Sequence, residues 1–376
     1  MSKYTLSKIQ RYVYASKITL VTVFAILAFY LSQNALAKTT LTKPTLDQWQ
    51  QFNVTTLNTY ILPRYKVLAE ESNLLAEASS KLCHETSAKN LTLNIQHFHR
   101  SFDAWQSIQN INFGPIETGM RGFSLQFWPD KKNHLGKRLQ ALLEQKNQHA
   151  LSDESFAKLA VSVKGFPAIE RLLFNDEALS LIQGQGFRCQ LLSKISHDIA
   201  RKAQALHTEW QEDMAPQFQN PTQVDGYFED EIDAATILLK TLVEPIEVIR
   251  DLKLKRPMGS KLAKAKYKRL ESWRSTRSVR NIRLNIQSLD ALYQGLKSLL
   301  SPSDIETIDT LFTQILKQTT DPLSVLSAPM KDSINTANGY AKMTQLIQTL
   351  SRLHAQLESS VGKLGVNLGF NSRDGD

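Results

Sequence analysis

Apolar residues recur three or four positions apart, the spacing of a helix face, along almost the whole chain. We find no convincing alternation of apolar and polar residues of the kind that marks a half-buried β-strand. Only 15 glycines and 12 prolines interrupt the 376 residues, so long helices can form. Such helices bury their apolar stripes against one another. The sequence therefore predicts an all-α fold of two packed antiparallel helical bundles.

Prolines, glycines and polar runs set the expected helix boundaries. The first bundle is expected over residues 38–215, with helices at 46–82 (kinked at Pro63), 91–111, 131–147, 152–174 and 188–214. A polar break over 215–226 ends this bundle. The second bundle is expected over 224–376, with helices at 227–253, 276–300, 303–318 and 335–364.

The first 37 residues are organised like an export signal. Their charged residues are all basic: Lys3, Lys8, Arg11 and Lys17. The apolar run that follows, residues 18–31, is short for a membrane-spanning helix. Ala35 and Ala37 then place small side chains where a signal peptidase reads them. We expect cleavage after Ala37 and a periplasmic mature chain, with an uncleaved membrane anchor as the alternative.

Export changes how charge and cysteine are interpreted. The formal net charge of +9 loses four positive residues with the signal, leaving 41 basic against 36 acidic residues, a net +5. This ordinary charge gives no reason to expect nucleic acid as a partner, and a membrane is expected to matter only through the export signal. Cys83 and Cys189 are the only cysteines. Two cysteines in an oxidising compartment favour one disulfide, although sequence alone does not show that they meet.

The stretch GFPAIERLLF, residues 165–174, places a glutamate and a proline on an apolar helix face. Glu170 would share that face with Phe156, Leu159, Ala160, Val163, Phe166, Leu173 and Phe174. A carboxylate directed into a core has to be paired, metal-bound or protonated. Pro167 in a helix interior costs about 3 kcal/mol and frees a carbonyl. These two unfavourable features indicate a functional site; a structural Glu–Arg pair between the bundles is the alternative.

Several motifs, taken in order, resemble the imelysin-like family of exported bacterial helical proteins. They are Asn112-Phe113-Gly114-Pro115, Phe127-Trp128-Pro129-Asp130, GFPAIERLL from Gly165, Phe187-Arg188-Cys189, Trp273-Arg274-Ser275-Thr276-Arg277-Ser278 and the tail from Gly369 to Asp376. The resemblance covers nearly the whole mature chain and implies a link to iron or other metal acquisition. Within these motifs we expect Gly114, Pro115, Gly165 and Pro167 to have structural roles, as we do for Cys83 and Cys189.

The family motif G-x-H-x-x-E is proposed to bind a metal or to belong to a peptidase, because its histidine and glutamate share a helix face. Gly165 and Glu170 match the motif, but Pro167 replaces the histidine. Catalytic zinc needs about three protein ligands. We therefore expect no catalytic residue and keep Glu170 as a candidate ligand for a divalent metal or iron. A metallopeptidase, with histidine ligands from elsewhere, is the alternative function.

A basic segment is the other distinctive feature. Its arginines recur every three residues: Arg274, Arg277, Arg280 and Arg283. Guanidinium groups bind carboxylate or phosphate in a bidentate manner, so an anionic partner is expected, with a solvated face as the alternative. His99 and Asp103, four residues apart, are interpreted as a satisfied surface pair and not as a metal site.

We expect the non-catalytic binding site in the cleft between the two bundles. The predicted ligand-binding residues are Trp128, Asp130, Glu170, Arg274, Arg277, Asn371 and Asp374. The expected partner is a small ligand, a metal or an anionic group. A cell-envelope protein partner and a purely structural scaffold are further alternatives. The tail is predicted to fold back, bury Phe370 and bring Asp374 to the basic segment.

Overall fold

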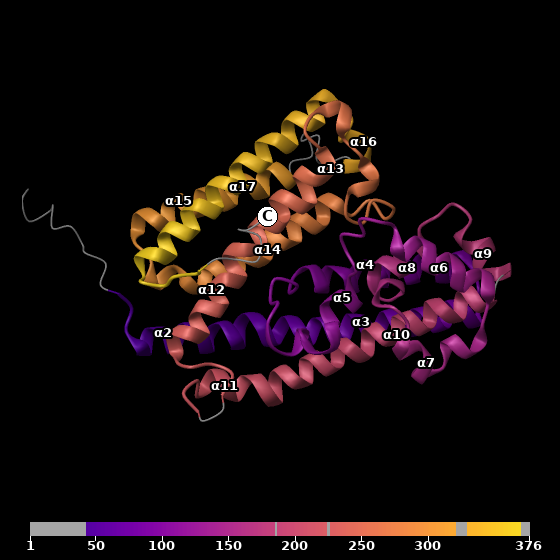
Figure 1. Cartoon of the computed structure of the whole chain (residues 1–376), viewed down its shortest axis with the longest axis horizontal. Coiled ribbons are helices and arrows are strands. Elements are labelled where there is room, and N and C mark those ends of the chain that lie inside the picture. The colour runs from indigo at the N-terminus through magenta and orange to yellow at the C-terminus, as the bar shows by residue number, and fades with distance from the viewer. Residues whose placement is uncertain (1–42, 185, 224–225, 321–328, 370–376) are drawn as a thin grey trace, which may run out of the picture. The chain divides into compact units, whose positions relative to one another are not determined.

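Helices are the regular elements of the part of the chain that the computed structural model describes: residues 43–184, 186–223, 226–320 and 329–369. These ranges contain no strand, and they form two groups of packed helices (Figure 1). The all-α prediction is confirmed. The proposed signal sequence and the tail from Phe370 lie outside the described residues.

The first group is built around α3 (Leu62–His84), which packs against both α4 (Ala88–Gln106) and α10 (Gly186–Glu209) (Figure 1). The buried residues of α3 recur three or four positions apart, as on one face of a helix, and they include Leu68, Leu75 and Leu82. Cys83 and Cys189 form a disulfide between α3 and α10, with Cα atoms 5.5 Å apart. The bridge therefore fixes one end of the longest helix–helix contact in this group.

Shorter elements complete the first group. Before α3, α2 (Leu46–Thr56) continues into a π-helical turn at Leu57–Ile61, so Pro63 lies in the first turn of the next helix. The remaining helices are α5 (Arg121–Leu125), α6 (His134–Gln145), α7 (Asp153–Lys158), α8 (Gly165–Leu173), α9 (Ala178–Gly184) and α11 (Ala215–Gln219).

The second group contains four long helices: α12 (Glu231–Glu247), α14 (Ser278–Leu296), α15 (Pro302–Thr320) and α17 (Ala337–Lys363). α17 packs on α12 and α15, and α14 packs on α15 and α12. A π-helical segment at Val248–Lys255 follows α12 and leads into α13 (Arg256–Met258), and α16 (Met330–Ser333) precedes α17. No helix of the described residues has the length and apolar character needed to cross a membrane.

The expected continuous helix over 152–174 is wrong. α7 ends at Lys158, the backbone is extended at Leu159, and a 3₁₀ turn at Val161–Val163 precedes α8. Pro167 is thus the third residue of α8, where a backbone N–H would have no acceptor within the helix. The proline breaks no helical hydrogen bond, so the expected cost of a proline in a helix interior does not arise.

Gly165 allows α8 to begin against the chain that precedes α6. Its φ of +74° lies in the left-handed region, and a Cβ there would stand 2.2 Å from the carbonyl oxygen of Leu125. Both the conformation and the close approach therefore require glycine. From this start α8 buries Phe166, whose ring stacks on Phe102 of α4 with centroids 4.7 Å apart. The apolar side of α8 is held against the first group, and Glu170 follows on the same buried stretch.

Candidate functional site

A cavity of about 580 Å³ brings together Trp128, Asp130, Pro167, Glu170 and Arg274, all of which the sequence had singled out. Its lining comes from both halves of the chain: the loop before α6 and α8 on one side, α13 and residues 268–274 on the other. This volume is in the range of small-molecule sites. Seven of its lining residues are cationic: Lys131, Lys132, Arg171, Arg256, Lys268, Arg269 and Arg274. We call it the basic cavity.

Glu170, one of three carboxylates lining the basic cavity, is tied to Ser275. The Oε1 atom of Glu170 accepts hydrogen bonds from the backbone nitrogen (2.9 Å) and the hydroxyl (2.7 Å) of Ser275. Burial raises the pKa of Glu170, while the bonds from Ser275 and the charges of Arg274 and Arg171 act in the opposite direction. The carboxylate connects α8 to the segment before α14, and Arg274 and Arg171 act on it through their charge.

Asp130 is the second carboxylate, and it caps α6. Its Oδ1 accepts from the backbone nitrogen of His134 (2.8 Å) and its Oδ2 from that of Leu135 (3.0 Å). An anion at this position suits the positive end of the helix dipole. Both oxygens of Asp130 are therefore used in fixing the loop that also carries Trp128, whose peptide bond to Pro129 is cis.

The third carboxylate, Glu271, forms a buried ion pair that the sequence did not reveal. Lys253 Nζ lies 2.9 Å from Glu271 Oε2, and the two side chains are only 4% and 2% exposed. Gln126 donates to Oε1 of Glu271 (2.6 Å), and Asn281 donates to Oε2 (3.0 Å). Burial lowers the pKa of Lys253, and Glu271 opposes that effect. The charge of Glu271 is thus balanced inside the protein.

Arg171 and Arg274 carry the positive charge beside Glu170. The guanidinium carbon of Arg274 lies 4.1 Å from the centroid of the Trp273 ring. Burial, and then the charge of Arg171, lower the pKa of Arg274 to about 10. Arg171 donates to Asn133 Oδ1 (2.6 Å). Within the described residues, neither arginine forms an ion pair with a carboxylate.

The structure does not place Arg277 in the lining of the basic cavity. Arg277 is buried and donates to His99 Nδ1 (2.8 Å), and together with Arg280 it forms ion pairs with Asp103. Burial, then the charges of Arg277 and Arg280, lower the pKa of His99 to about 4, so its ring is neutral and can accept from Arg277. The residues of the predicted His99–Asp103 pair are joined through Arg277, which fastens the start of α14 to α4.

The other predicted residues have separate locations. Gly114 has φ +69° at the start of a 3₁₀ turn that includes Pro115, and its backbone nitrogen donates to the Tyr227 hydroxyl (3.1 Å). Neither residue lines the basic cavity. Asn371 and Asp374 lie outside the described residues, as does the predicted packing of the tail.

The surroundings of Glu170 do not suit a metal cation. Its Oε1 already accepts two hydrogen bonds, Arg274 and Arg171 flank it in the cavity, and Pro167 offers no donor atom. In the described part of the chain, no group of three or more histidine, cysteine, aspartate or glutamate side chains could hold a metal ion. The geometry thus gives Glu170 no partner ligand for the metal role expected from the sequence.

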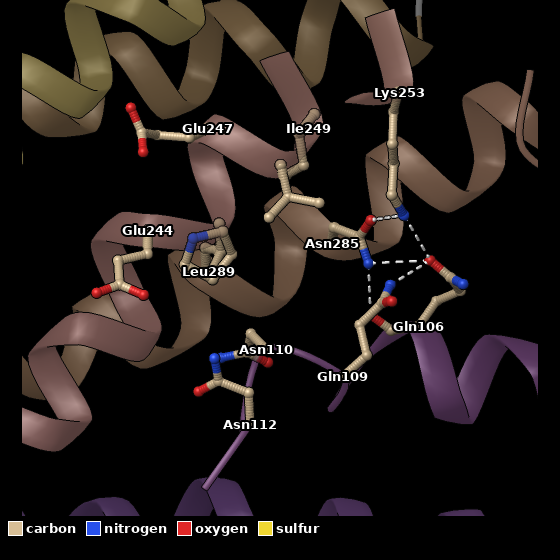
Figure 2. A pocket seen from close by; sticks show the side chains of 12 residues that line it. Gln106, Gln109, Asn110, Asn112, Glu244, Glu247, Ile249, Lys253, Asn285 and Leu289 are labelled. Atoms are coloured by element: carbon tan, nitrogen blue, oxygen red, sulfur yellow. Dashed lines mark hydrogen bonds between the residues drawn. The ribbon is translucent and has the colours of Figure 1, made fainter. Parts of the chain in front are cut away.

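A second cavity, of about 270 Å³, is lined by residues of α4, α12 and α14 and of the π-helical segment at Val248–Lys255 (Figure 2). Lys253 lines it, whereas Glu271 lines the basic cavity. Three polar side chains that line it are joined by hydrogen bonds: Asn285 donates to Gln106 Oε1 (3.1 Å), and Lys253 donates to the same oxygen (3.1 Å) and to Asn285 Oδ1 (2.6 Å). These hydrogen bonds hold Lys253, the cationic partner of Glu271, from the side of the second cavity.

The comparison with known proteins gives the family. The family model described as Imelysin matches residues 61–357. The chain belongs to the imelysin family. Its imelysin fold is similar to the crystal structure of an imelysin-like protein from Psychrobacter arcticum 273-4, with a TM-score of 0.71 and 17% identity, over 87% of this chain and 98% of that one.

Two further relatives carry another name. A putative iron-regulated protein A precursor from Parabacteroides distasonis ATCC 8503 has a similar structure, with a TM-score of 0.70 and 16% identity, over 85% of this chain and 96% of that one. Iron-regulated protein A from Synechococcus elongatus is 24% identical over 243 residues, which is 63% of this chain. The match spans 62% of that curated relative's length.

Proposed function

We propose that this imelysin-family chain is an exported, non-catalytic ligand-binding protein of the periplasm that acts in iron acquisition, and that it binds a negatively charged small ligand in the basic cavity. The observation that carries the proposal is a charge imbalance. Seven cationic side chains line the cavity, and its three carboxylates are held by Ser275, by the start of α6 and by Lys253. The net positive charge that remains favours an anion.

The non-catalytic part of the proposal rests on the residues that replace a peptidase site. Pro167 stands where the family motif has its histidine, and Glu170 directs Oε1 to Ser275. A carboxylate that accepts two buried hydrogen bonds is poorly placed to activate water in the cavity. Glu170 therefore acts as a positioning residue for the arginines beside it.

The link to iron comes from relatives. Iron-regulated protein A from Synechococcus elongatus and the putative iron-regulated protein A precursor from Parabacteroides distasonis both carry iron regulation in their names. The word precursor in the second name agrees with the export signal that residues 1–37 resemble. Together with the basic cavity, these names support a periplasmic protein that binds an anionic ligand and is linked to iron.

Equilibrium binding of inorganic phosphate and citrate to the mature protein tests the proposal. Calorimetry in a chelator-treated buffer should show saturable binding of at least one anion, weakened by added salt because the interaction is between charges. Arg274→Met should weaken it about tenfold or more, which corresponds to about 1.4 kcal/mol. Arg100→Met, which removes an exposed arginine of α4 that does not line the cavity, is the matched control. Absence of anion binding, or equal binding by Arg274→Met, would contradict the proposal.

A further inference from the structure

A protein that binds iron directly needs side chains that coordinate the metal, but the charged residues that line the basic cavity are mainly cations. We infer, resting on the proposed function, that iron enters this cavity inside a preformed anionic chelate: a ferric complex of a polycarboxylate. The arginines bind the carboxylates of the chelate, and no side chain lining the cavity coordinates the metal.

The first support is the pair Arg171 and Arg274. After burial, the charge of Arg171 is the largest cause that lowers the pKa of Arg274, and the opposing effect of Glu170 is smaller. Two like charges held together in a partly buried site repel each other, and an anion bound between them reduces that repulsion. Asn133 holds Arg171 and the Trp273 ring holds Arg274, so both guanidinium groups are oriented before any ligand arrives.

The second support is the state of the carboxylates. A bare cation needs free oxygen ligands, but Asp130 uses both oxygens to cap α6, and Glu271 is bonded through both oxygens to Gln126, Asn281 and Lys253. Glu170 directs one oxygen to Ser275 and is flanked by arginines. A free metal ion would therefore meet seven cations and few available donors, whereas a chelate brings its own ligands.

The third support is the distribution of the cations. Arg171 lies on α8, Arg256 on α13, and Lys268, Arg269 and Arg274 on the segment before α14. A ligand with one carboxylate can reach only part of this set. A polycarboxylate can meet several cations at once, and the planar guanidinium fork suits each carboxylate. The volume of about 580 Å³ leaves room for such a ligand with its metal.

The test compares three probes on chelator-treated protein: ferric citrate, metal-free citrate, and Mn²⁺ in citrate-free buffer. Iron that co-elutes with the protein in gel filtration is measured by elemental analysis, and affinities are measured by calorimetry. We expect ferric citrate to be retained, metal-free citrate to compete with it, and Arg274→Met to weaken both at least tenfold. Glu170→Asp keeps the carboxylate but shortens its reach to Ser275. This variant should displace the arginines and so weaken the binding of ferric citrate. The thermal midpoint of each variant shows that it is folded.

Each other outcome has a defined meaning. Binding of Mn²⁺ without citrate, lost in Glu170→Gln, would overturn the inference because the chain would then be supplying metal ligands. Binding of metal-free citrate with exclusion of ferric citrate would also overturn it, yet would leave the proposed anion site intact. Failure of every anion to bind would remove both the inference and the proposed function.

Discussion

Glu170 and Ser275 are 105 residues apart in the sequence, and a single carboxylate oxygen of Glu170 accepts both the backbone N–H and the hydroxyl of Ser275. Arg171 follows one partner directly and Arg274 precedes the other. The same two hydrogen bonds therefore set the separation of the two arginines. The sequence predicts Glu170 as a ligand, but in the structure its bonds to Ser275 hold Arg171 and Arg274 in one cavity.

Replacing Glu170 tests this connection through stability. Glu170→Ala leaves the buried backbone N–H of Ser275 without an acceptor, whereas the Ser275 hydroxyl can still donate to Ser272 O (3.2 Å). The free energy of unfolding should fall by about 2 kcal/mol. Glu170→Gln keeps an oxygen in place and should lose about 1 kcal/mol or less. Urea denaturation of both variants measures the difference. Equal losses would show that the hydrogen bonds to Ser275 contribute little.

The buried pair Lys253–Glu271 should behave as a unit. Lys253→Met leaves the carboxylate of Glu271 buried without its partner, and we expect a loss of about 3–5 kcal/mol in unfolding free energy. The double variant Lys253→Met/Glu271→Gln removes both charges, so it should recover at least half of that loss. A double-mutant cycle in urea gives the coupling. Additive losses would contradict a tightly coupled pair.

Pro167 distinguishes the observed helix start from the expected helix interior. In the first turn of α8 the proline breaks no hydrogen bond, and Pro167→Ala should change stability only slightly, with a loss of about 0.5–1 kcal/mol through greater freedom of the unfolded chain. In a helix interior the same substitution would stabilise by about 3 kcal/mol. The midpoint of chemical denaturation decides between the two signs.

His99 predicts a dependence of stability on pH. Its pKa is about 4 in the folded chain against an ordinary 6.5. The unfolded chain therefore binds more protons between these values, so the contribution of neutral His99 is complete above pH 6.5 and is lost as the pH falls toward 4. We expect the thermal midpoint to fall by about 3 °C from this source between pH 7 and pH 5.

His99→Gln is the control for this pH effect. The glutamine carbonyl can still accept from Arg277 but does not titrate. Its thermal midpoint should therefore fall less than that of the natural chain over the same pH range. An identical fall in both proteins would assign the effect to other groups.

The long helices could be predicted from the periodicity of apolar residues, but the interruption before Pro167 could not. Leu159, Ala160 and Val163 continue the apolar spacing through the segment where the backbone leaves the helix. The break depends on Gly165 approaching the carbonyl oxygen of Leu125, a contact between segments 40 residues apart in number. The spacing of apolar residues indicates which side chains are buried, but it does not predict such close backbone contacts.

Four of the seven predicted ligand-binding residues line the basic cavity, and the sequence did not predict their roles. Asp130, Glu170 and Arg274 could be selected because they stand out by type, and they do line one cavity. That Asp130 caps α6 and that Glu170 bonds to Ser275 depends on tertiary contacts. Lys253 and Glu271 gave no signal at all, because a charged residue in a polar sequence context looks solvated until the fold buries it.

The link between Cys83 and Cys189 turns the intervening chain into a covalent ring. Everything that the first half of the chain contributes to the basic cavity, from Gln126 to Arg171, lies inside that ring. A protease that cut at the exposed Lys131 or Lys132 would therefore leave both fragments attached, and the cut would become visible only after reduction. Arg256 and residues 268–274 lie outside the ring. After a single cut, the disulfide keeps the two fragments linked only if the cut lies between Cys83 and Cys189. The two walls of the cavity therefore differ in this protection.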